Sequence, residues 1–94
     1  MRKISTESIV QREDRHLIHT ELNEDLVMMD LENGSYLSLN RTGRIIWKEI
    51  EKPVVVKDLI IKLRYRFSID EETCTSETIK FLIKMEKQNV LKIL

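Results

Sequence analysis

The side chains best suited to nucleophilic or metal chemistry in this chain are Cys74, His16 and His19. A thiolate beside an imidazole forms a nucleophile with its general base, but no sequence feature brings Cys74 near either histidine. The histidines lie three residues apart, so an extended strand would direct them to opposite faces, and no third metal ligand is evident. We therefore expect a thiol in the core or on a helix surface, with no catalytic residues, no metal and no cofactor.

The sequence also lacks the short motifs that support common enzymatic chemistry. It contains no Gly-rich phosphate loop, no Cys-x-x-Cys pair and no His-Glu-x-x-His zinc motif. The 16 basic residues are balanced by 16 acidic ones, which argues against bulk attraction to a nucleic-acid backbone. These observations favour a protein that is not an enzyme and for which nucleic acid is an unfavoured partner.

The length and composition of the chain indicate a single soluble domain. With 94 residues, 41% of them hydrophobic and 34% charged, it can bury one modest core. One cysteine cannot form an internal disulfide, in keeping with a reducing compartment. The N-terminus has no signal-peptide core, and no segment approaches the roughly 18 apolar residues of a membrane span. We expect a cytoplasmic protein that does not contact a membrane.

A tight turn is predicted at Asn33-Gly34, because a type I′ hairpin turn needs positive φ at both central residues. Apolar residues on either side predict strands at 25–31 and 35–39. Period-two alternation predicts an earlier strand at 17–22, so the three strands form an antiparallel meander.

The predicted turn also sets which side chains lie opposite one another in the meander. A two-residue loop would pair Leu31 with Tyr36, Met29 with Ser38, and Met28 with Leu39. Apolar side chains then occupy both faces of the sheet. Either a helix covers the second face, or part of that face is a binding surface.

Three helices are predicted after the strands, at 42–51, at 56–66 and from Asp70 onwards, with Asp70 or Ser68 as the third N-cap. The apolar tail 90–94 is predicted to pack under the core or to add a short strand. The core-facing stripes are predicted at three-four spacing. They are Ile46, Trp47 and Ile50 in the first helix, Val56, Leu59, Ile60, Leu63 and Phe67 in the second, and Ile79, Leu82 and Ile83 in the third.

Together these patterns predict an α+β fold that is winged helix-turn-helix-like, with a three-stranded antiparallel sheet followed by three α-helices. Within the single domain 1–94, residues 1–15 would be an N-terminal extension, 16–40 the β-meander and 41–94 the three-helix part.

The same order of elements suits a small DNA-binding regulator, which is the alternative function. Basic residues give the second helix a positive side: Lys57, Lys62, Arg64 and Arg66. Against this, the would-be recognition helix carries acidic residues near its start, where DNA phosphates would repel them. These residues are Asp70, Glu71, Glu72 and Glu77.

The segment from the second strand to the first helix resembles the PqqD-like family of precursor-peptide recognition elements. The residues that carry the likeness are Val27-Met28-Met29-Asp30, Gly34, Tyr36, Leu39-Asn40, Gly43 and Ile46-Trp47. The resemblance extends over 17–94 and is strongest to the stand-alone B1 recognition proteins of lasso-peptide pathways. Met28-Met29 stand where the family commonly has leucines, which keeps the apolar volume but changes the shape of the surface.

The resemblance implies that the protein binds the leader segment of a ribosomally made precursor peptide as an added β-strand, between the third strand and the third helix. One wall of this site would be Tyr36, Leu37, Ser38, Leu39 and Asn40. The other would be Thr78, Phe81, Leu82 and Met85, with Lys80 and Lys84 at the rim. Core packing is the alternative role for Leu37, Leu39 and Leu82, and a solvated helix face is the alternative for the two lysines.

The partners implied by the resemblance are the precursor peptide, a separate leader peptidase of the B2 cysteine-protease type, and a lasso cyclase further along the pathway. The exposed edge strand leaves a third hypothesis open, in which two copies of the chain pair through the same edge as a homodimer.

Overall fold

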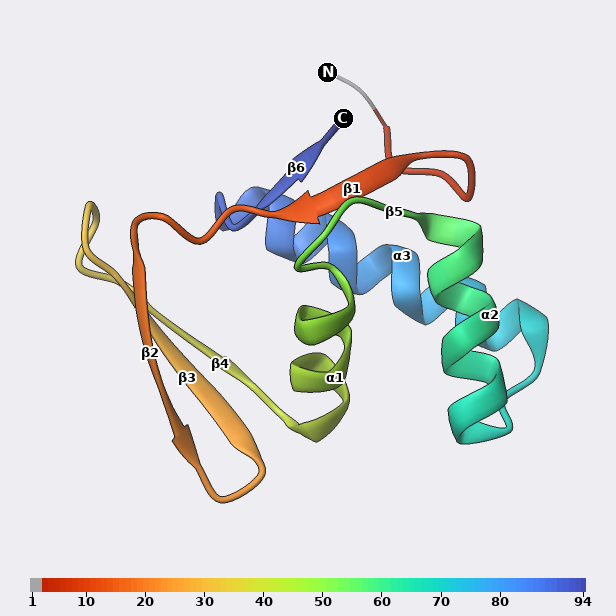
Figure 1. Ribbon diagram of the computed structural model, residues 1–94, viewed down its shortest axis with the longest axis horizontal. Coiled ribbons are helices and arrows are strands. Elements are labelled where there is room, and N and C mark those ends of the chain that lie inside the picture. Colours follow the sequence, from red (N-terminus) through yellow and green to blue (C-terminus); the bar gives the residue numbers. More distant parts are fainter. Residues whose placement is uncertain (1–2) are drawn as a thin grey trace.

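The computed structural model describes residues 3–94, which form three helices and two small antiparallel sheets (Figure 1). The elements in chain order are β1 (Ile9–Arg12), β2 (Leu17–Leu22), β3 (Asp25–Asp30), β4 (Tyr36–Leu39), α1 (Arg41–Glu49), β5 (Val54–Val55), α2 (Val56–Phe67), α3 (Glu71–Lys87) and β6 (Leu91–Ile93). The predicted α+β fold, with a winged-helix-like meander followed by three helices, is confirmed. No helix within residues 3–94 combines the length and the hydropathy needed to cross a bilayer.

The meander contains β2, β3 and β4 in that order, but the register between β3 and β4 differs from the predicted one. Met28 lies opposite Leu37, and Met29 lies opposite Tyr36. Each partner is displaced by two positions, because residues 31–35 all belong to the connection between the strands. Since side chains alternate with a period of two, this displacement leaves every side chain on its predicted face.

Asp30 determines the shape of the connection between β3 and β4. Its Oδ1 accepts the backbone N–H groups of Glu32 at 2.8 Å and Asn33 at 3.1 Å, and its Oδ2 accepts Nδ2 of Asn33 at 2.9 Å. Gly34 has a φ of +72°, but Asn33 is not among the described residues with positive φ. The predicted type I′ turn is therefore wrong, because the aspartate carboxylate organises a longer turn by binding the backbone directly.

Replacing Asp30 by alanine is expected to destabilise the fold in a pH-dependent way. Burial raises the pKa of Asp30, but the backbone N–H groups of Asn33 and Glu32, together with nearby His16 and the Asn33 side chain, hold the pKa below its ordinary value of 3.8. The charged carboxylate therefore contributes stability that is fully present above 3.8 and is lost as the pH falls through the folded-state pKa. At about pH 7 the Asp30→Ala variant should melt roughly 5–15 °C below the unsubstituted protein, with a smaller difference near pH 2.5.

Thermal denaturation followed by circular dichroism at both pH values measures this effect. Asp25→Ala is the matched control, because Asp25 is exposed at the start of the same strand. Equal melting temperatures for the two variants at neutral pH would contradict the role of Asp30.

The N-terminal segment that was predicted as an extension contributes a strand to the second sheet. β1 lies between β5 and β6, so it joins the start of α2 to the end of the described chain. Val10 of β1 is fully buried in the core. The tail 90–94 was predicted either to pack under the core or to add a short strand. It contains the strand β6, which pairs with β1.

All three helices begin close to the predicted positions, and polar side chains cap two of them, α1 and α3. Asn40 Oδ1 accepts the N–H of Gly43 at 3.0 Å, so α1 begins one residue earlier than predicted. Asp70 caps α3 through the N–H of Thr73 at 2.9 Å, which decides between the two predicted caps. Ser68 instead ends α2 in the left-handed conformation, with φ of 52°.

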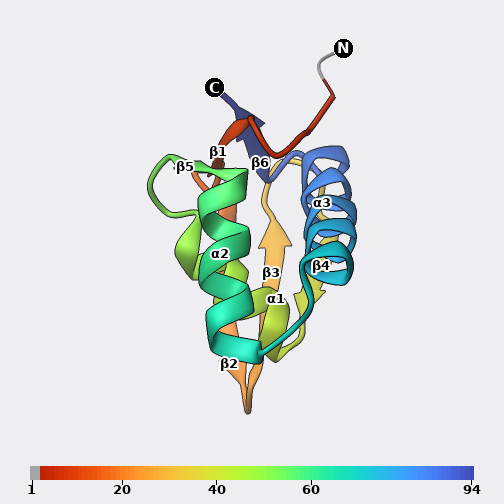
Figure 2. The same ribbon diagram turned by 90° about the vertical axis from the view of Figure 1, so that its right-hand side faces the viewer.

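The core lies between the inner face of the meander and the helices, which all occupy one side of this sheet (Figures 1 and 2). The outer face of the meander is left open. Ile18 is 52% exposed and Tyr36 is 72% exposed. The sequence left open whether a helix covers this face. Within the described residues no helix does, so that alternative is wrong. The largest fully buried side chains are Met28, Ile50, Leu59, Leu82, Met85, Val10, Val56 and Val90.

Candidate functional site

β4 forms an edge of the meander, and no strand within residues 3–94 pairs with its outer side. The N–H of Asp30 donates to the carbonyl oxygen of Ser35 at 2.8 Å, which makes these two residues a hydrogen-bonded pair of the antiparallel ladder. Hydrogen-bonded and non-hydrogen-bonded pairs alternate along such a ladder. The N–H and C=O groups of Tyr36 and Ser38 therefore point away from β3, toward the open edge. This edge can accept an extended chain as a further strand.

The opposite edge of the same sheet is β2, and no strand within residues 3–94 pairs with its outer side either. β2 is bridged to α1, because Arg44 forms an ion pair with Glu21 and donates to the carbonyl oxygen of Asn23 at 3.4 Å. A hollow of about 620 Å³ lies beside this bridge, lined by residues of both elements. Both edges of the meander can thus accept a further strand, and β2 is the one that an ion pair joins to α1.

The side chains of β4 alternate as the edge geometry requires. Tyr36 and Ser38 are exposed on the outer face, whereas Leu39 is buried and Leu37 is half-buried on the inner face. Asn40 is exposed at the end of the strand, but its side-chain oxygen is engaged as the cap of α1. Of the five residues predicted for this wall, the structure thus exposes three and turns two toward the core.

The structure divides the four residues predicted for the α3 wall. Leu82 and Met85 have no exposed surface, and Thr78 is also buried, so these three side chains face the core. Phe81 is half-buried and remains at the surface. Lys80 and Lys84 are exposed. Thr78 and Met85 are buried because the core-facing stripe of α3 is rotated about the helix axis relative to the predicted stripe.

The observed core stripe of α3 differs from the predicted one by this rotation. Its buried members are Cys74, Thr78, Leu82 and Met85. Ile79 and Ile83, which were predicted to fill the stripe with Leu82, are only half-buried. The thiol of Cys74 is buried, as one of its two predicted roles requires, with Sγ 3.8 Å from the carbonyl oxygen of Ile60.

Phe81 connects α3 to the point where β4 enters α1. A Cβ atom added to Gly43 would lie 3.1 Å from Cε1 of Phe81 and 3.3 Å from Cβ of Leu39. Gly43 is therefore needed for close approach, but to the ring of α3 rather than to the sheet alone. A hollow of about 220 Å³ opens beside this contact and is lined by Asn40, Gly43 and Phe81 together with residues of α2.

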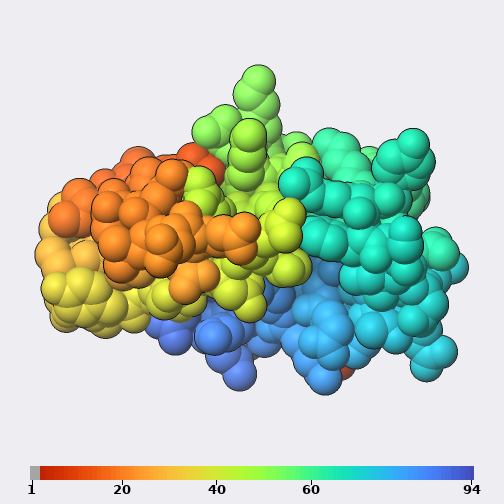
Figure 3. Space-filling model, turned by 90° about the horizontal axis from the view of Figure 1, so that it is seen from below, coloured from red at the N-terminus to blue at the C-terminus, as the bar shows by residue number. Residues whose placement is uncertain are grey.

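The β4 edge and α3 border the same side of the molecule. In the space-filling view, the blue surface of α3 adjoins the yellow and olive surface of residues 31–40 (Figure 3). Sequence reasoning missed the contribution of α2 and of the α2–α3 connection to the hollow, which includes Leu63, Phe67 and Ile69. No sequence signal marks them, because they belong to an ordinary core-facing stripe and a short connection.

The basic side of α2, which suggested DNA binding, is largely occupied by ion pairs. Lys57 approaches Glu7, and Lys62 approaches Glu49, each at 3.9 Å. Arg64 approaches Glu71 at the start of α3, at 3.8 Å. Such exposed pairs contribute little to stability, but they reduce the positive field available to a phosphate backbone. The geometry thus favours the edge strand over the helix surface as the binding site.

Comparisons with known proteins agree with this geometry. The family model described as coenzyme PQQ synthesis protein D (PqqD) matches residues 25–91. Among solved structures, the chain is similar to the one described as TbiB1 in complex with the TbiA(beta) leader peptide, with a TM-score of 0.74 and 19% identity. That similarity covers 84% of this chain and 92% of the other, and it shows a shared fold. No protein with a curated description matches the chain. Because the family match spans well over half of the sequence, this chain belongs to the PqqD family.

Proposed function

We propose that this protein is a non-catalytic adaptor that binds the leader segment of a ribosomally made precursor peptide. The observation that carries the proposal is the open edge of β4, where Tyr36 and Ser38 direct unused backbone groups outward. Membership of the PqqD family supports it, as does the similarity to a protein whose structure contains a leader peptide. A leader lying antiparallel or parallel to β4 would gain main-chain hydrogen bonds at these two residues.

The side chains around the edge have distinct roles in this proposal. Phe81 offers an apolar surface from α3, and the exposed ring of Tyr36 lies on the outer side of the edge. Lys80 and Lys84 would contact acidic leader residues, in competition with Glu77, which Lys80 approaches at 3.8 Å. The buried residues predicted for the walls would support the groove from within the core. These are Leu37, Leu39, Thr78, Leu82 and Met85, while Asn40 would fix the end of β4.

We further propose that the bound leader is presented to a separate leader peptidase of the B2 cysteine-protease type. A lasso peptide is the proposed product, with a lasso cyclase acting later and the cytoplasm as the site of assembly. The proposal is supported by a binding surface made of backbone groups, which holds a substrate but offers no nucleophile. The one cysteine is buried, with its Sγ 3.8 Å from the carbonyl oxygen of Ile60.

An amide NMR titration tests leader binding and its location together. The labelled full chain would be titrated with the synthetic leader of a candidate precursor, chosen from any short peptide encoded beside its gene. Shifts concentrated at residues 36–40 and 78–85 are the expected result. The absence of shifts at high excess of the leader would refute binding of that peptide.

Two further measurements on the same sample separate the alternatives. Binding to duplex DNA that weakens steeply with salt would support a regulator instead. A molecular mass that rises with protein concentration, and falls when leader is added, would indicate that two copies compete with leader for the β4 edge.

A further inference from the structure

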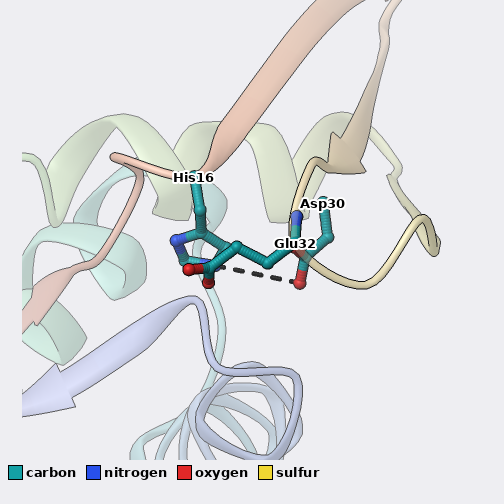
Figure 4. A group of neighbouring side chains, drawn as sticks. All are labelled: His16, Asp30 and Glu32. Carbon is teal, nitrogen blue, oxygen red and sulfur yellow. Dashed lines mark hydrogen bonds and ion pairs between the residues drawn. The ribbon is translucent and has the colours of Figure 1, made fainter.

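Three side chains with metal-binding groups meet at the end of the meander that lies away from α1. His16 precedes β2, Asp30 ends β3, and Glu32 lies in the connection to β4. One nitrogen or oxygen atom from each lies within 4.8 Å of the others. The close-up shows the Glu32 carboxylate beside the His16 ring, with Asp30 on the other side of the group (Figure 4). No third ligand for His16 and His19 was evident from the sequence, whereas the tertiary structure brings two carboxylates to His16.

The His16 ring presents an unused nitrogen to this cluster. Its Nε2 is buried and has no hydrogen-bond partner among the described residues. Oδ2 of Asp30 lies 3.9 Å away, beyond hydrogen-bond distance, and the two side chains are only 13% and 7% exposed. A buried polar nitrogen without a partner costs free energy, so the site lacks a group that would satisfy it.

The neighbouring positive charges form their short ion pairs with another carboxylate, although Arg15 also attracts Glu32 at longer range. Arg15 and Lys92 both line the hollow around the cluster, but both pair with Glu13, at 2.8 Å and 3.8 Å. The carboxylates of Asp30 and Glu32 therefore face His16 without a guanidinium or ammonium ion pair of their own among the described residues. The hollow has a volume of about 680 Å³, which leaves room for a cation with bound water.

We propose that His16, Asp30 and Glu32 bind a divalent cation of the zinc class. A neutral imidazole nitrogen and two carboxylate oxygens form a mixed ligand set that suits Zn²⁺, with water completing a tetrahedron. Ligand distances of about 2.0–2.2 Å require the three atoms to approach one another more closely than they do here. The exposed Glu32 side chain is free to move toward the other two. Asp30 is held in place by its turn, so the His16 ring must also move closer to Oδ2 of Asp30 than its present 3.9 Å.

A cation at this position would tie the chain entering β2 to the connection between β3 and β4. It would thus stabilise the connection that leads into the open edge strand, whether or not that edge binds a leader. Asp30 would bridge the two roles, since its Oδ1 organises the turn while its Oδ2, which also accepts Nδ2 of Asn33, faces His16. The proposal does not depend on the proposed function.

Isothermal titration of Zn²⁺ into the full chain tests this site, using protein that carries no histidine tag and has been freed of metal with a chelator. We expect one Zn²⁺ per chain, a higher melting temperature with Zn²⁺, and a shift of the His16 imidazole ¹⁵N resonances. His16→Gln and Glu32→Gln should each weaken binding by about tenfold or more. The control His19→Gln should leave it unchanged, because His19 is exposed on β2 outside the cluster.

Circular dichroism of each variant shows whether it is folded. If His16→Gln does not fold, Glu32→Gln still tests the site. Absence of Zn²⁺ binding at about 0.1 mM, where even a weak site of that dissociation constant is half filled, would overturn the proposal. Binding that survives both His16→Gln and Glu32→Gln would overturn it equally.

Discussion

Replacing Ser38 by proline is expected to abolish leader binding while leaving the domain folded. Proline removes the N–H that Ser38 directs to the open edge, and its ring projects toward an incoming strand. The ladder between β3 and β4 does not use this N–H, because Ser38 opposite Val27 is a non-hydrogen-bonded pair. Loss of a main-chain bond together with the steric clash should weaken leader affinity by at least about tenfold, as measured by the same NMR titration.

Ser38→Ala is the matched control for this substitution. It removes the hydroxyl group but retains the N–H, so leader affinity should stay close to that of the unsubstituted protein. The amide spectrum of Ser38→Pro without leader should show shifts near β4 only. If Ser38→Pro is folded and binds leader as tightly as Ser38→Ala does, strand addition at this edge is excluded.

Replacing Leu82 by alanine is expected to affect stability far more than recognition. Leu82 is fully buried, and truncation of a buried leucine costs about 2–5 kcal/mol in the free energy of unfolding. A domain of this length has a total free energy of unfolding of roughly 5–14 kcal/mol, so the loss is a large part of it. Urea denaturation measures the change directly, because the midpoint falls in proportion to the lost stability.

Ile61→Ala provides a control of similar size on an exposed helix position, since Ile61 is 61% exposed. Its free energy of unfolding should change by less than about 0.5 kcal/mol. Leader affinity of the folded Leu82→Ala protein should change only a little. A stable Leu82→Ala variant with lost leader binding would instead return Leu82 to the wall of the groove, as the sequence first suggested.

The α3 residues show what helical periodicity in the sequence predicts and what it does not. The sequence identified a long helix from Asp70 with apolar residues on two flanks, and both features are present. It assigned the core stripe to Ile79, Leu82 and Ile83, whereas the fully buried residues include Met85 and exclude both isoleucines. Apolar side chains surround so much of this helix that its rotation depends on what packs against it. Phe81 stays at the surface as a candidate contact because of that rotation.

The turn after β3 shows that local turn propensity is also an incomplete guide to structure. The Asn33-Gly34 pair correctly indicated a chain reversal, but the side chain of Asp30 changed the turn and with it the register by two positions. A local propensity for one turn type was overridden by a buried carboxylate that binds backbone N–H groups. The faces of the strands were still correct, because a displacement of two preserves alternation.

The sequence by itself determined most elements of this protein from local patterns: three meander strands, three helices with Asp70 among the predicted caps of the third, and the motif of the PqqD family from Val27 to Trp47. These follow from alternation, three-four spacing and capping, which act over a few residues. Only the tertiary structure decided the pairing of β1 with β5 and β6, the rotation of α3 and the meeting of His16 with Asp30 and Glu32. Each of these joins residues distant in the sequence or depends on a packing partner, and neither periodicity nor propensity carries that information.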